Sequence, residues 1–139
     1  MAKFLANAKL VKGFRIDVDD GRSHALCLDL PRDDDGTDMG PSALELCLMS
    51  HAGCYVTIFV LTANKMRFTL KDLEVKVEAV KSAAVGTITE EKFYITVRAA
   101  IPEDRVQRIH EVTLRNCPVG KLFEKAGVKI AYKLKTTKE

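Results

Sequence analysis

Four side chains that can do chemistry lie within one long apolar stretch, from Gly40 to Arg67. They are two thiols, an imidazole and a carboxylate, namely Cys47, Cys54, His51 and Glu45. Each of these groups is costly or unusual in an apolar core, so we expect the chemistry of the chain to involve them. Cys54 taken alone is also explained as a small buried hydrophobe, because free cysteine is among the most buried residue types.

Cys117 has a different setting, between Asn116 and Pro118 at the expected start of a late helix. Backbone N–H groups at a helix start favour a thiolate, so we expect a lowered pKa for Cys117. A cysteine followed by proline at such a position indicates a redox-active thiol. A solvent-side cysteine at a helix junction fits the sequence equally well.

A metal site is the competing interpretation of the same residues. Cys47, His51 and Cys54 are spaced i, i+4 and i+7, so they share one helical face and could bind zinc together with Cys117. Structural zinc sites usually draw on C-x-x-C pairs in turns, and the chain has no such pair, so we expect neither metal nor cofactor. We expect His51 to be a hydrogen-bonded interior histidine near Cys54. The other two histidines, His24 and His110, are expected on the surface.

The stretch from Gly40 to Arg67 is predicted to form one helix that is apolar on nearly every side, which is typical of a helix buried by protein all round. Pro41 suits its first turn, and basic residues near its end suit the helix dipole. The segment is long enough to span a membrane, but the polar groups Glu45 and His51 within it favour a core helix and no membrane partner.

The remaining segments favour strands before and after this helix, by their alternation and turn residues. Three strands precede it, at Lys3–Val11, Phe14–Val18 and Ser23–Leu30. Three follow it, at Asp72–Val80, Lys92–Ile101 and Val128–Leu134. Helices are predicted from Pro102 to Asn116 and from Pro118 to Ala126, a loop over Ser82–Glu91, and a polar tail over Lys135–Glu139.

The order βββ–α–ββ–αα–β predicts an α+β fold, with an antiparallel sheet wrapped around a long buried central helix. The 139 residues are enough for one domain, which we place at residues 1–139. So few strands cannot cover the central helix on all sides, so we expect a second subunit to cover the rest in a symmetric dimer.

Composition narrows the class of protein further. The chain is 47% hydrophobic and 29% charged, which fits a soluble globular protein. A net charge of +3, with scattered lysines, argues against a nucleic-acid partner. No basic stretch near Met1 leads into an apolar run, so we expect a cytoplasmic protein. Thiols are kept reduced there, so the four cysteines are not read as a disulfide framework.

Two motifs together resemble the OsmC/Ohr family of thiol peroxidases. They are GPSALELCLMSHAGC at residues 40–54 and NCPVGKLFEKAG at residues 116–127. Family members carry a Pro-x-Glu-Leu-type start to a long helix, a reactive cysteine within it, and a second cysteine followed by proline at the start of a late helix. The order of strands and helices also fits, so the resemblance covers nearly the whole chain. It implies an intertwined homodimer with active sites at the subunit interface.

The resemblance also implies an activity, the reduction of organic hydroperoxides or hydrogen peroxide in oxidative-stress defence. Cys54 would be the peroxidatic thiol and Cys117 the resolving thiol. The chemistry is sound, because a thiolate that attacks an O–O bond becomes a sulfenic acid, which condenses with a nearby thiol to a disulfide. An external dithiol then restores both sulfurs by exchange. The non-enzymatic alternative is a dimer whose apolar cleft binds an acyl chain or another hydrophobic ligand.

The attacking thiolate needs a positive partner, because Cys54 in mid-helix cannot use a helix N-terminus. Arg15 is the candidate, since it matches a functional arginine of some family members. Arg22 and Arg32 are the other candidates, and a solvated arginine at a strand end explains Arg15 equally well.

Glu45 is the candidate acid, nine residues before Cys54. At about 100° per residue the two lie on opposite faces of one helix, so Glu45 would orient an arginine across the dimer. Many peroxidase members carry the acid ten residues before the cysteine, where this chain has Leu44. Glu45 therefore fits a less characterised branch of the family. Favourable charge at a helix N-terminus also explains it.

Overall fold

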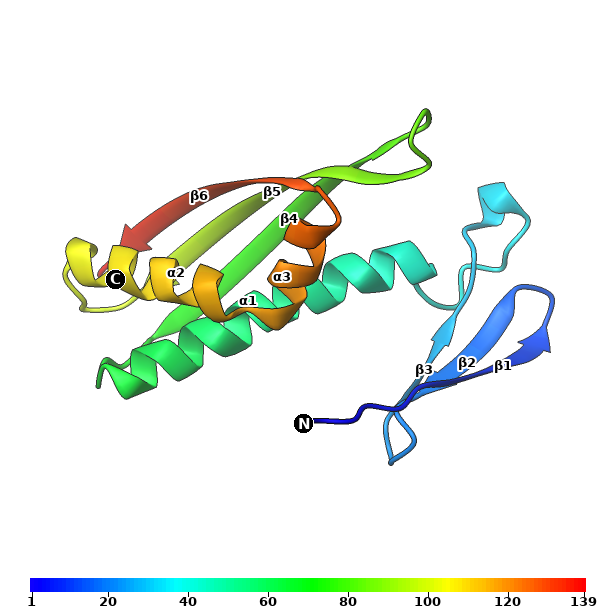
Figure 1. The fold of residues 1–139 in the computed structure, drawn as a ribbon, viewed down its shortest axis with the longest axis horizontal. Helices are drawn as coiled ribbons and strands as arrows, with labels where there is room; N and C mark the ends of the chain where they lie inside the picture. The colour runs from blue at the N-terminus through cyan, green and yellow to red at the C-terminus, as the bar shows by residue number, and fades with distance from the viewer. The chain divides into compact units, whose positions relative to one another are not determined.

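The chain is described over all 139 residues by a computed structural model with two compact units, an N-terminal unit (Met1–Cys47) and a C-terminal unit (Leu48–Glu139). Figure 1 labels the elements, which follow the predicted order with one short 3-10 helix (η1) added. The strands are β1 (Asn7–Lys12), β2 (Arg15–Asp19), β3 (Ala25–Leu28), β4 (Asp72–Ser82), β5 (Thr87–Arg98) and β6 (Lys129–Thr137). The helices are η1 (Arg32–Asp34), α1 (Ala43–Lys65), α2 (Glu103–Asn116) and α3 (Pro118–Lys125). The α+β class is thereby confirmed.

The N-terminal unit contains an antiparallel sheet in the order β1–β2–β3. β1 and β3 are shorter than predicted, whereas β2 has the predicted length and is shifted by one residue. β3 ends at Leu28 because the next backbone N–H, that of Asp29, donates to the carbonyl of Pro41 instead of continuing the sheet. Asp29 is buried, and its carboxylate accepts bonds from Thr37 and from nearby backbone N–H groups. These bonds, led by the Thr37 hydroxyl, lower the pKa of Asp29 to about 2.

The C-terminal unit contains a second sheet in the order β4–β5–β6. β4 and β5 are antiparallel, but β5 and β6 are parallel, so the prediction of a purely antiparallel sheet is wrong for that pair. The reason is the connection, because β5 reaches β6 through two helices and such a crossover can bring a strand back in parallel. β6 also runs on to Thr137, so most of the predicted polar tail belongs to the sheet.

The predicted loop over Ser82–Glu91 is wrong at its end, because β5 already begins at Thr87. Glu91 therefore lies inside the sheet, opposite Ala79 on β4 and Ile130 on β6. Side chains alternate between the two faces of a strand, and Glu91 lies on the same face as the buried Phe93. An acid on the core face breaks the apolar alternation, which explains why the sequence indicated a loop here.

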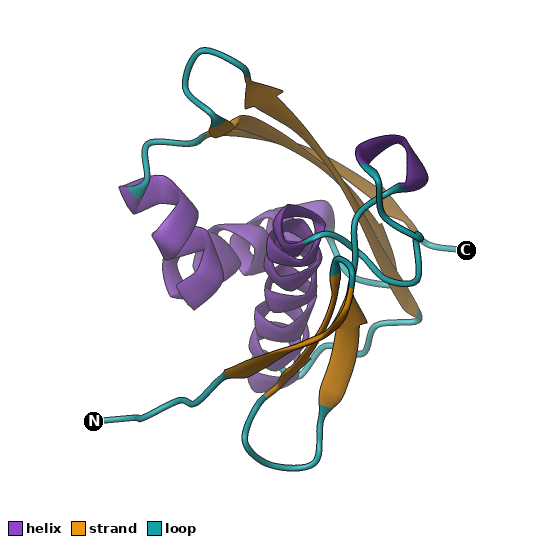
Figure 2. Ribbon diagram, turned by 90° about the vertical axis from the view of Figure 1, so that its right-hand side faces the viewer, coloured by secondary structure: helices purple, strands orange, loops and turns teal.

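The helices α1 and α2 pack against the same face of β4–β6, as Figures 1 and 2 show. The core between them is built from large side chains of α1, β5 and α2, namely Tyr55, Phe59, Phe93, Ile95, Val97, Val106 and Ile109. In a single copy only one face of α1 is fully buried, and Met49 and Leu61 are exposed. The prediction of a helix buried on every side is therefore not met within one chain. By length and composition alone α1 could cross a membrane, a test that core helices of soluble proteins also pass.

Candidate functional site

The structure brings Cys54 and Cys117 together within the C-terminal unit. Cys54 lies in the middle of α1 and Cys117 at the junction of α2 and α3, and the two thiols are near enough that Cys54 contributes to the raised pKa of Cys117. Both are free cysteines, with Cys54 half-buried and Cys117 only 2% exposed. Folding thus places side by side two sulfurs that are far apart in the sequence, one of them more accessible than the other.

Cys117 is held in place because it ends one helix and begins the next. Its backbone N–H donates to the carbonyl of Thr113 and closes α2. Its Sγ is the N-cap of α3 and accepts a bond from the Gly120 N–H at 3.3 Å. Pro118 occupies the first position of α3, where a missing N–H costs nothing.

The prediction of a lowered pKa for Cys117 is wrong. Burial raises the pKa of the Cys117 thiol to about 11, and the neighbouring Cys54 acts in the same direction. The Gly120 N–H does lower the pKa, as expected for a helix start, but this effect is smaller than the loss of solvation. Near neutral pH Cys117 is therefore a protonated thiol.

A buried histidine–carboxylate pair lies beside the thiols. His51, one turn before Cys54 on α1, places Nδ1 2.9 Å from both carboxylate oxygens of Glu91. The two side chains are 2% and 0% exposed. The ring of His51 stacks on Phe123 of α3 at 4.6 Å and meets the edge of Phe93 at the same distance. The prediction of an interior, hydrogen-bonded His51 is confirmed.

Gly120 lies between this pair and the Cys117 thiol. A Cβ added at Gly120 would lie 3.3 Å from Cys117 Sγ and 3.3 Å from His51 Nε2. The two atoms therefore border the same small space, which only a glycine leaves open. The Nδ1 side of the ring faces Glu91, and the Nε2 side faces the start of α3.

A second buried histidine, His110 of α2, was predicted on the surface, and that prediction is wrong. His110 is 6% exposed, and its Nδ1 shares a hydrogen bond of 2.6 Å with the hydroxyl of Tyr55. Burial lowers the pKa of His110 and raises the pKa of Tyr55, so both groups are neutral. The sequence misled because His110 follows the buried Ile109 on the inner face of α2. His24 is exposed as predicted and pairs with Asp20.

The other two predicted site residues, Arg15 and Glu45, lie in the N-terminal unit. Arg15 donates from Nε to the Thr37 hydroxyl at 3.0 Å and lies 4.0 Å from the Asp29 carboxylate. Glu45 forms a capping box at the start of α1, in which its carboxylate accepts the Ser42 N–H at 3.0 Å. In return its own N–H donates to the Ser42 hydroxyl at 3.2 Å. The Ser42 backbone bond lowers the pKa of Glu45. Roles of both residues toward Cys54 stay predictions.

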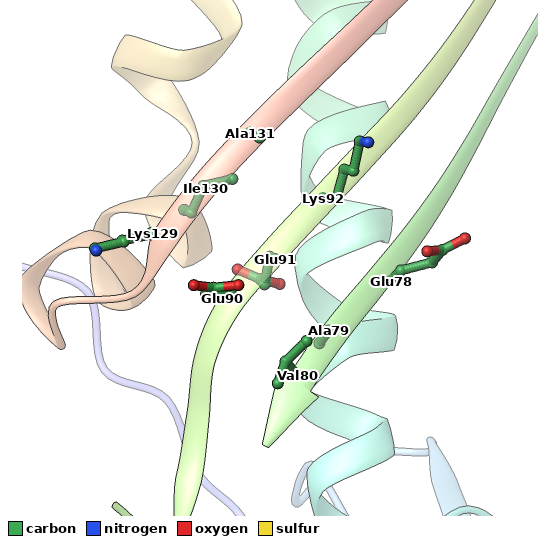
Figure 3. A pocket seen from close by; sticks show the side chains of 9 residues that line it. All are labelled: Glu78, Ala79, Val80, Glu90, Glu91, Lys92, Lys129, Ile130 and Ala131. Carbon is green, nitrogen blue, oxygen red and sulfur yellow. The ribbon is translucent and has the colours of Figure 1, made fainter. Parts of the chain in front are cut away.

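The missed residue of this site is Glu91. The only signal in the sequence was an acid at a position that the alternation of β5 assigns to the core face. A pocket of about 400 Å³ among β4, β5 and β6 is lined in part by Glu91 and contains none of the thiols. Figure 3 shows Glu90 and Glu91 near its middle, with Lys129 on one side. Within the chain, no group of three or more His, Cys, Asp or Glu side chains could hold a metal ion, so the zinc alternative has no site here.

Fold and site together define an α+β protein with two neighbouring free thiols, one half-buried and one buried. The chain belongs to the OsmC-like protein family, because residues 35–133 match the model of that family. Similar solved structures include an OsmC-like protein from Mycoplasma pneumoniae, with 17% identity, a TM-score of 0.88 and coverage of 98% of each chain.

Two further similar structures have names that refer to hydroperoxides. An organic hydroperoxide resistance protein OsmC from Legionella pneumophila has 15% identity and a TM-score of 0.75, and the match covers 97% of this chain and 98% of that one. An organic hydroperoxide resistance protein from Elizabethkingia anophelis has 13% identity and a TM-score of 0.74, with coverage of 99% and 98%. At these identities the likeness is one of fold. No match was found among curated proteins.

Proposed function

We propose that the protein is a cysteine-based peroxidase that reduces organic hydroperoxides, or hydrogen peroxide, in oxidative-stress defence. The observation that carries the proposal is that the thiols of Cys54 and Cys117, far apart in the sequence, lie near enough to influence each other. Membership of the OsmC-like family supports it, as do the names of the hydroperoxide resistance proteins that share the fold.

The reaction has three steps in which atoms and electrons balance. The Cys54 thiolate attacks the distal oxygen of the hydroperoxide, the O–O bond breaks, and an alcohol leaves after protonation. The resulting Cys54 sulfenic acid is attacked by Cys117, which forms the S–S bond and releases water. An external dithiol reduces the disulfide and is itself oxidised.

Burial supports this order of the two thiols. Cys54 is half-buried and Cys117 almost fully buried, so an oxidant reaches Cys54 first. Cys117 is also the thiol whose pKa is raised, which suits a partner that reacts second.

The surroundings of the reaction are part of the proposal. We place Arg15 as the cation beside the Cys54 thiolate and Glu45 as the acid that orients it across a homodimer, with the active sites at the subunit interface. A cytoplasmic location would supply the dithiol reductant and keep the thiols reduced between turnovers.

The test is turnover of tert-butyl or cumene hydroperoxide with a dithiol reductant, together with intact mass after one equivalent of hydroperoxide. We expect a loss of two hydrogens that maps to Cys54 and Cys117. Cys54→Ser abolishes turnover, and Cys117→Ser stops at a sulfenic acid that dimedone labels on Cys54. A chain with both Cys27→Ser and Cys47→Ser is the matched control and keeps its turnover. Absence of turnover with every reductant, or dimedone labelling on Cys117, would overturn the proposal.

A further inference from the structure

We propose that His51 is the general base of the resolving step and that Glu91 positions it. As Cys117 Sγ attacks the sulfur of Cys54, His51 Nε2 takes the Cys117 proton. This inference rests on the proposed function, because that function supplies the Cys54 sulfenic acid.

The hydrogen bonds of the His51 ring leave the correct nitrogen available. A carboxylate accepts and cannot donate, so the contacts of 2.9 Å to both oxygens of Glu91 place the ring hydrogen on Nδ1. In the neutral form of the ring the lone pair is then on Nε2. This atom borders the space at Gly120 that Cys117 Sγ also borders, each 3.3 Å from the position of a Cβ there. The arrangement follows the nucleophile–base–orienting acid logic of catalytic triads.

The resolving thiol needs such a base because it cannot lose its proton to water easily. Cys117 is 2% exposed, and burial raises its pKa to about 11. The attacking species in disulfide formation is nevertheless the thiolate. A base within the protein removes this barrier at neutral pH.

The other titratable groups around the ring do not fill this role. Cys54, on the same helix, is the sulfur under attack. Tyr132, on β6, has a pKa raised to about 12 by burial and is a protonated phenol. Glu91, on β5, is bonded to the Nδ1 side of the ring, away from the thiol. Imidazole is the most frequent general base in enzymes, and Nε2 of this one borders the same space at Gly120 as Cys117 Sγ.

The surroundings also stabilise the charge that the step creates. An imidazolium formed at His51 stays in contact with the Glu91 carboxylate, in a site from which water is largely excluded. The rings of Phe123 and Phe93 hold the imidazole in its orientation. The S–O bond of the sulfenic acid breaks as the S–S bond forms, and the proton held by His51 goes to the leaving hydroxide to give water.

The decisive experiment uses Ellman's reagent, so that no peroxide chemistry is required. In the full-length chain with Cys27→Ser and Cys47→Ser, the reagent forms a mixed disulfide on the more accessible Cys54 and releases one thionitrobenzoate. Attack of Cys117 on the Cys54 sulfur then releases a second thionitrobenzoate in a first-order phase. The rate of this second phase reports the loss of the Cys117 proton.

We expect His51→Gln to slow the second phase at pH 7 by about a hundredfold or more, the lower end of the range for general acid–base catalysis. The wild-type rate should reach a plateau as pH rises, whereas the His51→Gln rate should keep rising with hydroxide. A purely structural role would change the rate but not this pH profile. Glu91→Gln should weaken the effect of His51 and shift the plateau.

His110→Gln is the matched control, because His110 is also a buried, hydrogen-bonded histidine of the same unit. It should leave the second phase and its pH profile unchanged. A wild-type rate and profile in His51→Gln, or an equal slowing in His110→Gln, would overturn the inference. If His51→Gln does not fold, the plateau shift in Glu91→Gln decides, and its absence counts against the inference.

The outcomes separate the two proposals. Normal peroxide turnover with an unchanged second phase in His51→Gln would contradict the role of His51 as a base and support the peroxidase function. If no hydroperoxide oxidises the protein but His51→Gln slows the second phase, the peroxidase function is contradicted and the role of His51 as a base is supported.

Discussion

The two units each bury one carboxylate, and the partners of these acids differ in kind. Asp29 in the N-terminal unit and Glu91 in the C-terminal unit are both 3% exposed. Asp29 is bonded to backbone N–H groups and to the Thr37 hydroxyl, which do not act as acids or bases near neutral pH. Glu91 is bonded to the ring of His51, and an imidazole is a side chain that can act as a general base.

The partners of a buried carboxylate therefore indicate whether it stabilises local structure or can take part in a reaction. Burial of a carboxylate alone says only that the fold has to compensate for lost solvation. Asp29 is compensated by groups that fix the loop after β3, so its role is to hold local structure. Glu91 is compensated by a ring whose other nitrogen reaches the space beside Cys117, so its bonds can orient a proton transfer.

The largest expected effect comes from deleting the two acids in turn. Glu91→Ala leaves the buried Nδ1 of His51 without a partner, which should cost about 1–3 kcal/mol of the free energy of unfolding. It should also slow the second thionitrobenzoate phase. Asp29→Ala should destabilise the fold as well, but leave that phase at the wild-type rate. Urea unfolding and the Ellman's assay measure the two quantities.

Equal slowing of the second phase in Glu91→Ala and Asp29→Ala would contradict the distinction between the two acids. The distinction is also contradicted if Glu91→Ala resolves at the wild-type rate while losing stability, because Glu91 would then be structural like Asp29.

A smaller effect is expected from filling the space at Gly120. In Gly120→Ala the new methyl group would lie 3.3 Å from both Cys117 Sγ and His51 Nε2, so one of them has to move. We expect the second phase to slow several-fold. The stability change should stay within about 1 kcal/mol, because the crowding is offset by the better helix propensity of alanine.

Gly53→Ala is the control for the glycine change itself. Gly53 lies within α1, and a Cβ added there meets nothing within 4 Å. We expect stabilisation by about 0.5–1 kcal/mol and an unchanged second phase. Equal rates in Gly120→Ala and Gly53→Ala would show that the space at Gly120 is not used in resolution.

The sequence predicts the order of elements well and singles out the two thiols that the structure brings near each other, because both depend on local signals. Cys54 lies in a strongly apolar helix, and Cys117 precedes a proline at a helix start. Each of these signals can be recognised without knowledge of the fold. The match to the family model covers residues 35–133 and so includes both thiols.

The residues that surround the thiols could not be predicted, because their environment is set by contacts between distant segments. The sequence around Glu91 indicates a loop, because the contacts that bury Glu91 come from β6 and α1, which are distant in the sequence. The sequence around His110 indicates a surface position, because its hydrogen-bond partner Tyr55 is also distant in the sequence. The pKa of Cys117 was predicted in the wrong direction for the same reason. A helix start is visible in the sequence, whereas the burial that outweighs it is not.

The stabilisation that Asp29 contributes to the folded chain depends on pH. Its pKa is about 2 in the folded chain, below the ordinary value of 3.8, chiefly because of the bond from Thr37. Between these values the unfolded chain binds more protons than the folded one. The stabilisation is therefore present above about pH 4 and is lost as pH falls toward 2.

Asp29→Asn should flatten this acid limb of a stability–pH curve measured by urea unfolding. An acid limb as steep as that of the wild type would assign the loss to other carboxylates and weaken the contrast with Glu91.

The smallest expected effect concerns Glu45, an exposed acid that by its bonds resembles Asp29 rather than Glu91. Its carboxylate accepts the Ser42 N–H in the capping box of α1, so Glu45→Ala should cost about 0.5–1 kcal/mol of stability. Glu45→Gln keeps the bond and removes the charge. If Glu45 only caps α1, Glu45→Gln retains both stability and peroxide turnover. If Glu45 instead orients Arg15 across a dimer, Glu45→Gln lowers the rate of Cys54 oxidation as Arg15→Gln does, while the second thionitrobenzoate phase stays unchanged. Glu45→Gln keeps the cap intact, and the two roles predict opposite results for it. Its peroxide turnover therefore decides whether a carboxylate that is bonded to backbone N–H groups is purely structural in this protein.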